Sequence, residues 1–156
     1  MIRAARPSDK KKIMDLWLQG NLVAHSFIAA DFWYESYDLV AETYLPAAET
    51  FVFEDKHRLK GFISLVDKNY IGALFVAPSF QGQKVGSKLL RYVQRHLPHL
   101  CLNVYAANRR ALRFYQKSGF KIVNEQVDPQ TQEKELLMAW GMACLSGFKK
   151  RCSGDS

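Results

Sequence analysis

The sequence lacks the features that mark membrane-spanning, exported or metal-binding proteins. In its 156 residues no apolar run approaches the roughly 18 residues of a transmembrane helix, so no membrane partner is expected. The first residues carry no apolar signal-peptide core, and we expect a cytoplasmic protein. The three cysteines are far apart and form no CxxC pair, which argues against a bound metal.

The composition is that of an ordinary globular protein with an excess of positive charge. Hydrophobic residues make up 48% of the chain and charged residues 24%, which is enough for one buried core. We expect a single domain over residues 1–142 and a flexible basic tail over 143–156. The net charge of +7 favours polyanionic partners. Part of this charge lies in the tail, so it does not by itself identify a nucleic-acid-binding protein.

Apolar periodicity and turn residues predict a mixed sheet with helices on its faces. The first helix is expected to stop near Gly20–Asn21, and Pro46 to end the second. Asp55–Arg58 is expected to form a hairpin turn between two strands, and Gly119 to adopt the left-handed conformation that ends the last helix. In the second helix Trp33, Tyr37 and Tyr44 are expected to face the core. The predicted strands are 2–5, 51–53, 59–66, 70–76, 100–105, 120–127 and 133–140, and the predicted helices are 8–20, 30–45, 85–97 and 108–117.

The segment Gln81–Ser87 follows a predicted strand and opens a predicted helix. The first N–H groups of a helix have no partner within it, and the helix dipole makes this end positive, so phosphate binds well there. Gly82 and Gly86 let the backbone approach a ligand closely. The spacing fits neither a P-loop nor a dinucleotide-binding fingerprint. We predict contact with a phosphate-bearing cofactor.

A second segment places Asn108 and Tyr115 seven residues apart. On a helix this spacing puts both side chains on one face, about 10 Å apart along the axis. A tyrosine hydroxyl is a suitable proton donor to a departing thiolate. The pair therefore indicates a reactive end for the cofactor.

Taken together, the two segments resemble the motifs of the GNAT superfamily of acetyl-CoA-dependent N-acetyltransferases. Gln81 to Gly86 resembles the family's pyrophosphate motif. Asn108 to Phe120 resembles the pattern Asn-x-x-Ala-x-x-Phe-Tyr-x-x-x-Gly-Phe. The resemblance runs from the first strand to Trp140. It is closest to small bacterial N-acetyltransferases with a His-x-Phe-aliphatic stretch, here His25–Ile28.

The resemblance implies an α+β fold with a central, mostly antiparallel sheet of six to seven strands flanked by about four helices. It implies acetyl-CoA as cosubstrate, no metal, and direct attack of a primary amine on the thioester. Asn108 and Tyr115 would contact the cofactor, with Tyr115 as general acid. The other implied cofactor contacts are Leu74, Phe75 and Val76 on the central strand, and Gln81, Gly82, Gln83, Lys84, Val85, Gly86 and Ser87 in the loop.

Two features depart from the family pattern. Lys84 stands where the motif has glycine, and it either restricts the loop or adds positive charge near the phosphates. The glutamate that many relatives use as a base is also missing, since its places hold Gly72, Ala73 and Asn103. The candidate replacements are His25, Glu35, Glu42 and water relayed to bulk. His25 is preferred as the catalytic base, because an ordinary histidine pKa suits this task.

The acceptor is expected to bind against Phe27, Trp33, Asn103 and Tyr105. A protein lysine, a protein N-terminus and a small amine all remain open as acceptors. Nucleic acid is not favoured as a partner, but acetylation of aminoacyl-tRNA remains an alternative. A further alternative is an acyl-CoA sensor without catalysis. Monomer and homodimer are both compatible with the sequence.

Overall fold

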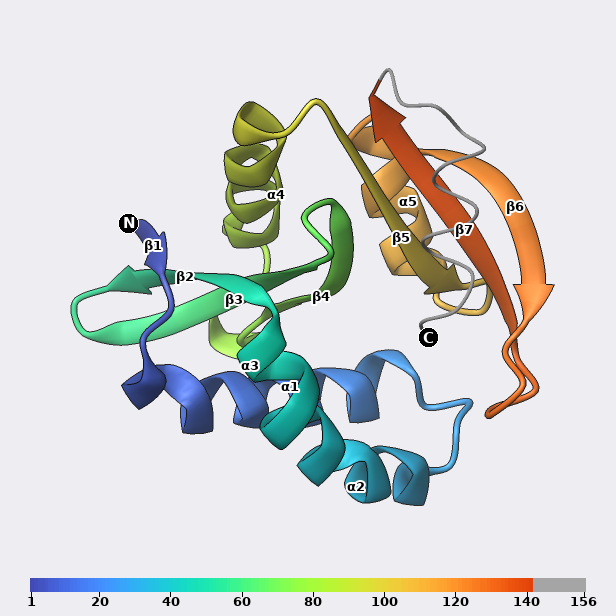
Figure 1. The fold of residues 1–156 in the computed structure, drawn as a ribbon, viewed down its shortest axis with the longest axis horizontal. Helices are drawn as coiled ribbons and strands as arrows, with labels where there is room; N and C mark the ends of the chain where they lie inside the picture. Colours follow the sequence, from blue (N-terminus) through green and yellow to red (C-terminus); the bar gives the residue numbers. More distant parts are fainter. Residues whose placement is uncertain (142–156) are drawn as a thin grey trace. The chain divides into compact units, whose positions relative to one another are not determined.

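A computed structural model describes residues 1–141, so the predicted tail over 143–156 lies outside the described residues. The chain forms two compact units, Met1–Arg95 and a second unit that begins at His96. Within these 141 residues, seven strands and four α-helices of at least nine residues confirm the expected α+β class (Figure 1). Within residues 1–141 no helix is long and apolar enough to cross a membrane.

The first unit contains four strands in the order β1 to β4, and each pairs antiparallel with the next. Lys56 and His57 form the predicted turn between two of them, with φ values of 51° and 64°, as a two-residue hairpin turn requires. Opposite Ser64 and Leu65 the register shifts, which leaves Gly72 as an extra residue in β4. The strands are β1 (Ile2–Ala4), β2 (Glu49–Asp55), β3 (Arg58–Val66) and β4 (Tyr70–Val76).

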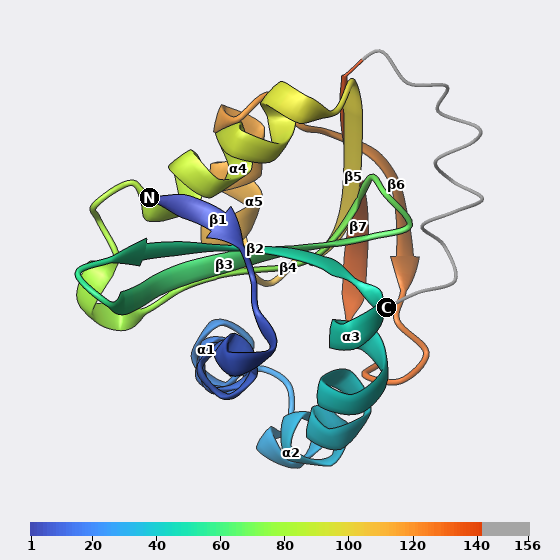
Figure 2. The ribbon, with the colours of Figure 1, turned by 60° about the vertical axis from the view of Figure 1, so that its left-hand side comes forward.

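Helices cover both faces of these strands, with α1 and α2 on one side and α4 on the other (Figure 2). Each helix turns an apolar stripe inward, such as Met14 and Trp17 on α1 and Leu89 and Val93 on α4. Phe62 on β3 is buried in the same core. The helices are α1 (Lys10–Ala24), α2 (Ala30–Leu39), α3 (Leu45–Ala47) and α4 (Val85–His96), with a π-helix at Val40–Tyr44 between α2 and α3.

The expectation that the first helix stops near Gly20–Asn21 is wrong, because α1 continues to Ala24. Glycine is usually a poor residue for a helix interior. Here a β-carbon at position 20 would overlap the ring of Phe75 on β4. The glycine is therefore explained by close packing of α1 against β4, and not by a helix end.

The second helical segment also differs from expectation. It continues to Ala47, so Pro46 lies in the first turn of α3, where a proline is tolerated. Trp33 is buried as expected, but Tyr44 is exposed. The π-helix at Val40–Tyr44 explains this, because one extra residue in a turn rotates everything beyond it away from the core-facing side.

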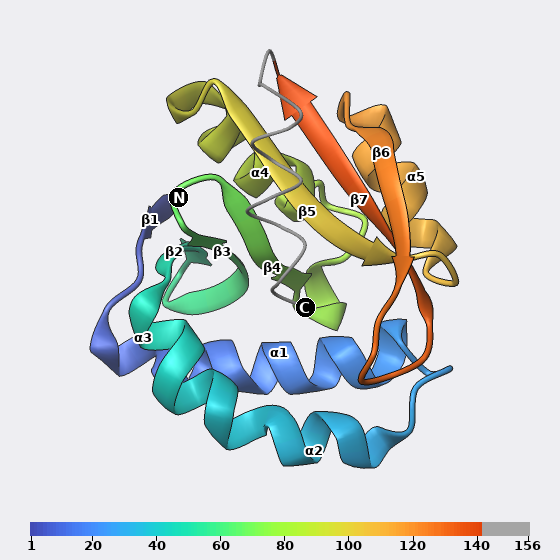
Figure 3. The same ribbon diagram turned by 45° about the vertical axis from the view of Figure 1, so that its right-hand side comes forward.

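The second unit places three antiparallel strands in the order β5-β7-β6, with α5 packed beside them (Figure 3). Leu102, Met138 and Phe120 are buried in its core. Gly119 has a φ of 97° directly after α5, which confirms the predicted left-handed helix end. The elements are β5 (His99–Tyr105), α5 (Arg109–Lys117), β6 (Lys121–Val127) and β7 (Lys134–Gly141).

Candidate active site

The loop between β4 and α4 contains two residues in the left-handed region, Gly82 and Lys84. The side-chain amide of Gln81 donates to the carbonyl of Val76 at 3.4 Å and ties the loop to the end of β4. Gly82 has a φ of 83°, and a β-carbon there would meet nothing within 4 Å. The N–H of Lys88 bonds the carbonyl of Lys84 at 3.0 Å, which closes the first turn of α4. The N–H groups of residues 85–87 precede this bond and have no acceptor within the helix.

The backbone conformation of Lys84 explains why the family motif has glycine at this position. Its φ is 64°, in the left-handed region that a residue with a β-carbon adopts at a cost of roughly 1–2 kcal/mol. The loop nevertheless keeps this conformation with lysine in place. The side chain is exposed and adds a positive charge at the start of α4.

The predicted cofactor strand is β4, where Leu74, Phe75 and Val76 pair with β3. Gly61 on β3 lies opposite Val76, and a β-carbon there would sit 2.8 Å from the carbonyl oxygen of Phe75. The ring of Phe75 is held between Gly20 and Phe62, whose ring centroid is 6.0 Å away. The end of β4 is thereby fixed on one edge by β3 and on one face by α1.

In the second unit, Asn108 is the N-cap of α5 and not its first residue. Its Oδ1 accepts a hydrogen bond from the N–H of Ala111 at 3.2 Å, the usual capping bond. Tyr115 is buried on α5, with the rings of Phe114 and Phe120 edge-on at 5.1 and 5.4 Å. This packing fixes the plane of the phenol ring.

The preferred base, His25, lies at the C-terminal end of α1 in an aromatic cluster. Its ring stacks on Trp33 at 5.4 Å and meets Phe27 edge-on at 5.7 Å. Its Nδ1 lies 2.9 Å from Oδ1 of Asn21. The structure thus brings together three residues that the sequence placed in one site. The indole N–H of Trp33 is buried and has no hydrogen-bond partner within residues 1–141.

Burial lowers the pKa of His25 to about 4. The sequence analysis expected an ordinary histidine pKa at this position, and that expectation is wrong. The ring is neutral at physiological pH and is a weak base. A neutral imidazole can still accept a hydrogen bond through its unprotonated nitrogen.

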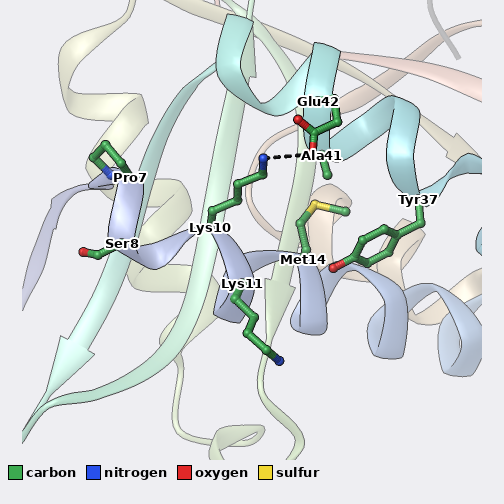
Figure 4. Close-up of a pocket in the computed structure, with 8 residues that line it drawn as sticks. All are labelled: Pro7, Ser8, Lys10, Lys11, Met14, Tyr37, Ala41 and Glu42. Atoms are coloured by element: carbon green, nitrogen blue, oxygen red, sulfur yellow. Dashed lines mark hydrogen bonds and ion pairs between the residues drawn. The ribbon is translucent and has the colours of Figure 1, made fainter.

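The alternative bases have other environments. Glu42 pairs with Lys10 at 3.0 Å, beside a pocket of about 370 Å³ to which Met14 and Tyr37 also contribute (Figure 4). Glu35 is exposed on α2. Glu42 is therefore engaged in an ion pair with a lysine.

On β5, the predicted acceptor residues Asn103 and Tyr105 are both half-buried. The hydroxyl of Tyr105 donates to Oδ2 of the buried Asp128 at 2.6 Å. Burial, together with this carboxylate, raises the pKa of Tyr105. The hydroxyl of Tyr105 therefore stays protonated and donates to Asp128. The amine substrate would contact the ring of Tyr105 and not its hydroxyl.

Asn21 is the residue of this site that the sequence analysis did not identify. It is buried inside α1 and bonds the histidine four residues further on. An asparagine one helical turn before a candidate histidine is the signal that could have found it. As for metals, no group of three or more potential ligands occurs among residues 1–141.

The sequence model of the acetyltransferase (GNAT) domain matches residues 16–142. The chain is 39% identical over 140 residues to the peptidyl-lysine N-acetyltransferase YiaC of Escherichia coli (strain K12), covering 90% of this chain and 96% of that protein. It is 31% identical over 122 residues to the peptidyl-lysine N-acetyltransferase YjaB of the same organism, covering 78% and 82%.

The fold comparison agrees with the sequence comparison. The solution structure of apo-form YjaB from Escherichia coli superposes with a TM-score of 0.79 at 29% identity, covering 91% of this chain and 98% of that chain. The similarity therefore extends over nearly all of both molecules.

Proposed function

Because this chain belongs to the GNAT acetyltransferase family and is an acyltransferase, we propose that it moves an acetyl group from acetyl-CoA to a lysine side chain of a protein. The observation that carries the choice of acceptor is the 39% identity, over 90% of the chain, to a peptidyl-lysine N-acetyltransferase. A cytoplasmic location remains a prediction from the sequence.

The residues present fit acetyl-CoA. Gly82 leaves open space where a side chain would stand. The N–H groups of residues 85–87 lie in the first turn of α4 and have no acceptor within the helix. The lysines at 84 and 88 add positive charge to this turn. Such a turn binds a diphosphate through backbone donors and the helix dipole. The backbone of Leu74, Phe75 and Val76 would hold the pantetheine arm, and Asn108 would contact the cofactor.

Acetyl-CoA supplies the acetyl group as a thioester. The acceptor nitrogen forms a bond to the carbonyl carbon, the carbon–sulfur bond breaks, and the amine loses a proton. Tyr115 donates its hydroxyl proton to the departing sulfur. A backbone N–H near Phe75 or Val76 stabilises the negative charge that develops on the carbonyl oxygen, an effect typically worth about 3 kcal/mol.

The acceptor must arrive as a neutral amine. For a lysine with a pKa of about 10.4, this costs roughly 4.6 kcal/mol at pH 7. A histidine with a pKa of about 4 is too weak a base to hold that proton at pH 7, so we infer that water relays the proton to the bulk solvent. His25, Phe27 and Trp33 together would form the surface against which the acceptor binds.

The test is release of coenzyme A thiol from acetyl-CoA on a panel of acceptors. The panel contains a peptide with an internal lysine and a blocked N-terminus, the same peptide with the lysine already acetylated and its N-terminus free, a set of small amines, and aminoacyl-tRNA. We expect turnover on the first peptide, with a mass gain of one acetyl group on its lysine. Turnover only on one of the other acceptors would overturn the choice of lysine. Acetyl-CoA binding without turnover on any acceptor would instead support the sensor.

A further inference from the structure

Lys60 is the extra residue of a β-bulge in β3. Phe53 and Glu54 of β2 are consecutive, but their partners on β3 are residues 61 and 59. On the other side, the backbone carbonyl of Lys60 accepts a hydrogen bond of 2.8 Å from the N–H of Ala77, the residue that follows β4. Bulges change the direction of a side chain and are common next to active sites. This one places Lys60 beside the loop between β4 and α4.

The ammonium group of Lys60 contacts an aromatic ring and a carboxylate. Its Nζ lies 4.7 Å from the ring centroid of Phe80, within the range of a cation–π interaction, and 3.3 Å from Oδ2 of Asp55. The hydrogen bond from Lys60 lowers the pKa of Asp55, so both groups are charged at neutral pH. The side chain of Lys60 is only 13% exposed. Because a cation–π interaction is stronger where water is kept away, the contact with Phe80 contributes more than an exposed one.

Phe80 connects this contact to the predicted diphosphate loop. It is the last residue of a 3₁₀ helix that begins at Pro78, and Gln81 follows it directly. The N–H of Phe80 bonds the carbonyl of Ala77 at 2.9 Å, and the N–H of Gln81 bonds the carbonyl of Pro78 at 3.3 Å. A three-residue 3₁₀ helix has few hydrogen bonds of its own, and their geometry is poor. The position of this turn therefore depends on what the ring of Phe80 contacts.

Lys60 itself is poorly placed to bind a phosphate. Its charge is already paired with Asp55, and its side chain is largely buried. Lys84 and Lys88, by contrast, are exposed at the start of α4. The surroundings of Lys60 therefore suit the fixing of a neighbouring side chain better than direct contact with a ligand.

We propose that Lys60 is a positioning residue, which holds the ring of Phe80 and thereby fixes the backbone from Gln81 to Lys84 for the diphosphate of acetyl-CoA. This inference rests on the proposed use of acetyl-CoA. The left-handed conformation of Lys84 persists only where the surrounding structure holds it, and the anchored Phe80 supplies part of that support. A loop that already has its bound conformation loses less freedom when the ligand arrives.

Amide hydrogen exchange tests the anchor in the ligand-free protein. Lys60→Met keeps the apolar stem and removes the charge, so the N–H groups of Phe80 and Gln81 should exchange about 5-fold to 20-fold faster. Lys60→Arg keeps a cation at the ring and should restore the wild-type rates. Lys68→Met is the matched control, because it removes the same charge from the exposed turn beyond the far end of β3, roughly 25 Å along the strand, and should change neither rate. Equal exchange in Lys60→Met and wild type would overturn the anchor.

Calorimetric titration with coenzyme A connects the anchor to the cofactor. Lys60→Met should weaken the binding of coenzyme A by about 5-fold to 20-fold and raise the KM for acetyl-CoA similarly, while kcat changes by less than about 2-fold. Phe80→Leu tests the same contact from the other side, because it keeps the charge and removes the ring, and it should weaken binding equally. In the Phe80→Leu background Lys60→Met should then have little further effect. Two additive losses would show that Lys60 acts by its charge, and would overturn the positioning role.

Failure of this inference and failure of the proposed function give different results. Wild-type protein that binds coenzyme A as tightly as Lys60→Met does would overturn the positioning role alone. Wild-type protein that binds no coenzyme A would overturn the proposed function, while the exchange rates still show whether Lys60 holds Phe80.

Discussion

Gly20 of α1 and Phe75 of β4 are in such close contact that a β-carbon at position 20 would overlap the phenyl ring. The contact joins the helix that carries Asn21 and His25 to the strand predicted to hold the cofactor. It gives a helical glycine a packing role. The ring belongs to Phe75, whose backbone we propose to contact acetyl-CoA.

We expect Gly20→Ala to destabilise the protein by about 1–3 kcal/mol through overpacking, although alanine is the better helix former by about 1 kcal/mol. Phe75→Ala alone should also destabilise the protein, through the cavity that it leaves. In the double variant the new methyl group has room, so its penalty should disappear. Denaturant unfolding of the four proteins measures this coupling, and strictly additive effects would contradict the contact.

The left-handed conformation of Lys84 predicts different stabilities for two variants that both remove its charge. Lys84→Gly should be more stable than Lys84→Ala by about 1 kcal/mol, because only glycine adopts a φ of 64° without strain. At Lys11, inside α1, the same two substitutions should show the opposite order, since alanine is preferred in a helix. Equal stabilities for the two Lys84 variants in denaturant unfolding would show that the loop does not need this conformation.

The role of Tyr115 predicts a loss of rate without a loss of binding. Tyr115→Phe keeps the ring contacts with Phe114 and Phe120 but removes the proton donor, so kcat should fall by about 10²–10⁴. The affinity for acetyl-CoA, measured by calorimetry, should change little. Tyr34→Phe on the exposed surface of α2 is the control and should retain full activity. A fully active Tyr115→Phe would remove this residue as the acid.

Arg3 holds the carboxylate of Asp9 with two hydrogen bonds of 2.9 and 3.1 Å, and the backbone N–H of Arg6 adds a third at 2.7 Å. The hydrogen bond from Arg3 is the main cause that lowers the pKa of Asp9. Asp9→Asn should destabilise the protein by about 1–3 kcal/mol at pH 7, because Arg3 loses one of its two charged partners in a partly buried site and keeps only Glu54.

The effect of pH on this pair has a definite sign. A lowered folded-state pKa stabilises the protein fully above the unfolded value of about 3.9, and this stabilisation is lost as the pH falls below it. The difference between wild type and Asp9→Asn in denaturant unfolding should therefore shrink below about pH 4. Asp15→Asn, which breaks only the exposed pair with Lys11, should change stability by less than about 1 kcal/mol at any pH. A difference at Asp9 that is independent of pH would contradict the ion pair.

The features that the sequence predicted correctly depend on short stretches of chain. The hairpin turn at Lys56–His57 and the left-handed Gly119 need only their immediate neighbours. The junction between a strand and a helix at Gln81–Ser87 likewise lies in one continuous segment. Local backbone preferences act over a few residues, so the sequence alone can reveal them.

The features that sequence analysis missed depend on contacts between distant segments. Gly20 resembles a helix end until the ring of Phe75 is packed against it. The low pKa of His25 comes from burial, which no single segment determines. The side chain of Asn21 is held by two hydrogen bonds, one to the Trp17 carbonyl and one to the His25 ring. In each case tertiary packing overrides the local preference.

The π-helix at Val40–Tyr44 holds one residue more than an α-helix of the same number of turns. A turn with one surplus residue absorbs an insertion without breaking the helix on either side. Removal of one residue there would give a continuous α-helix, turn the side chain of Tyr44 by about 100° towards the strands, and draw the start of β2 back by about 1.5 Å. The extra residue thus determines which side chains of α3 face the strands, and where the chain enters β2.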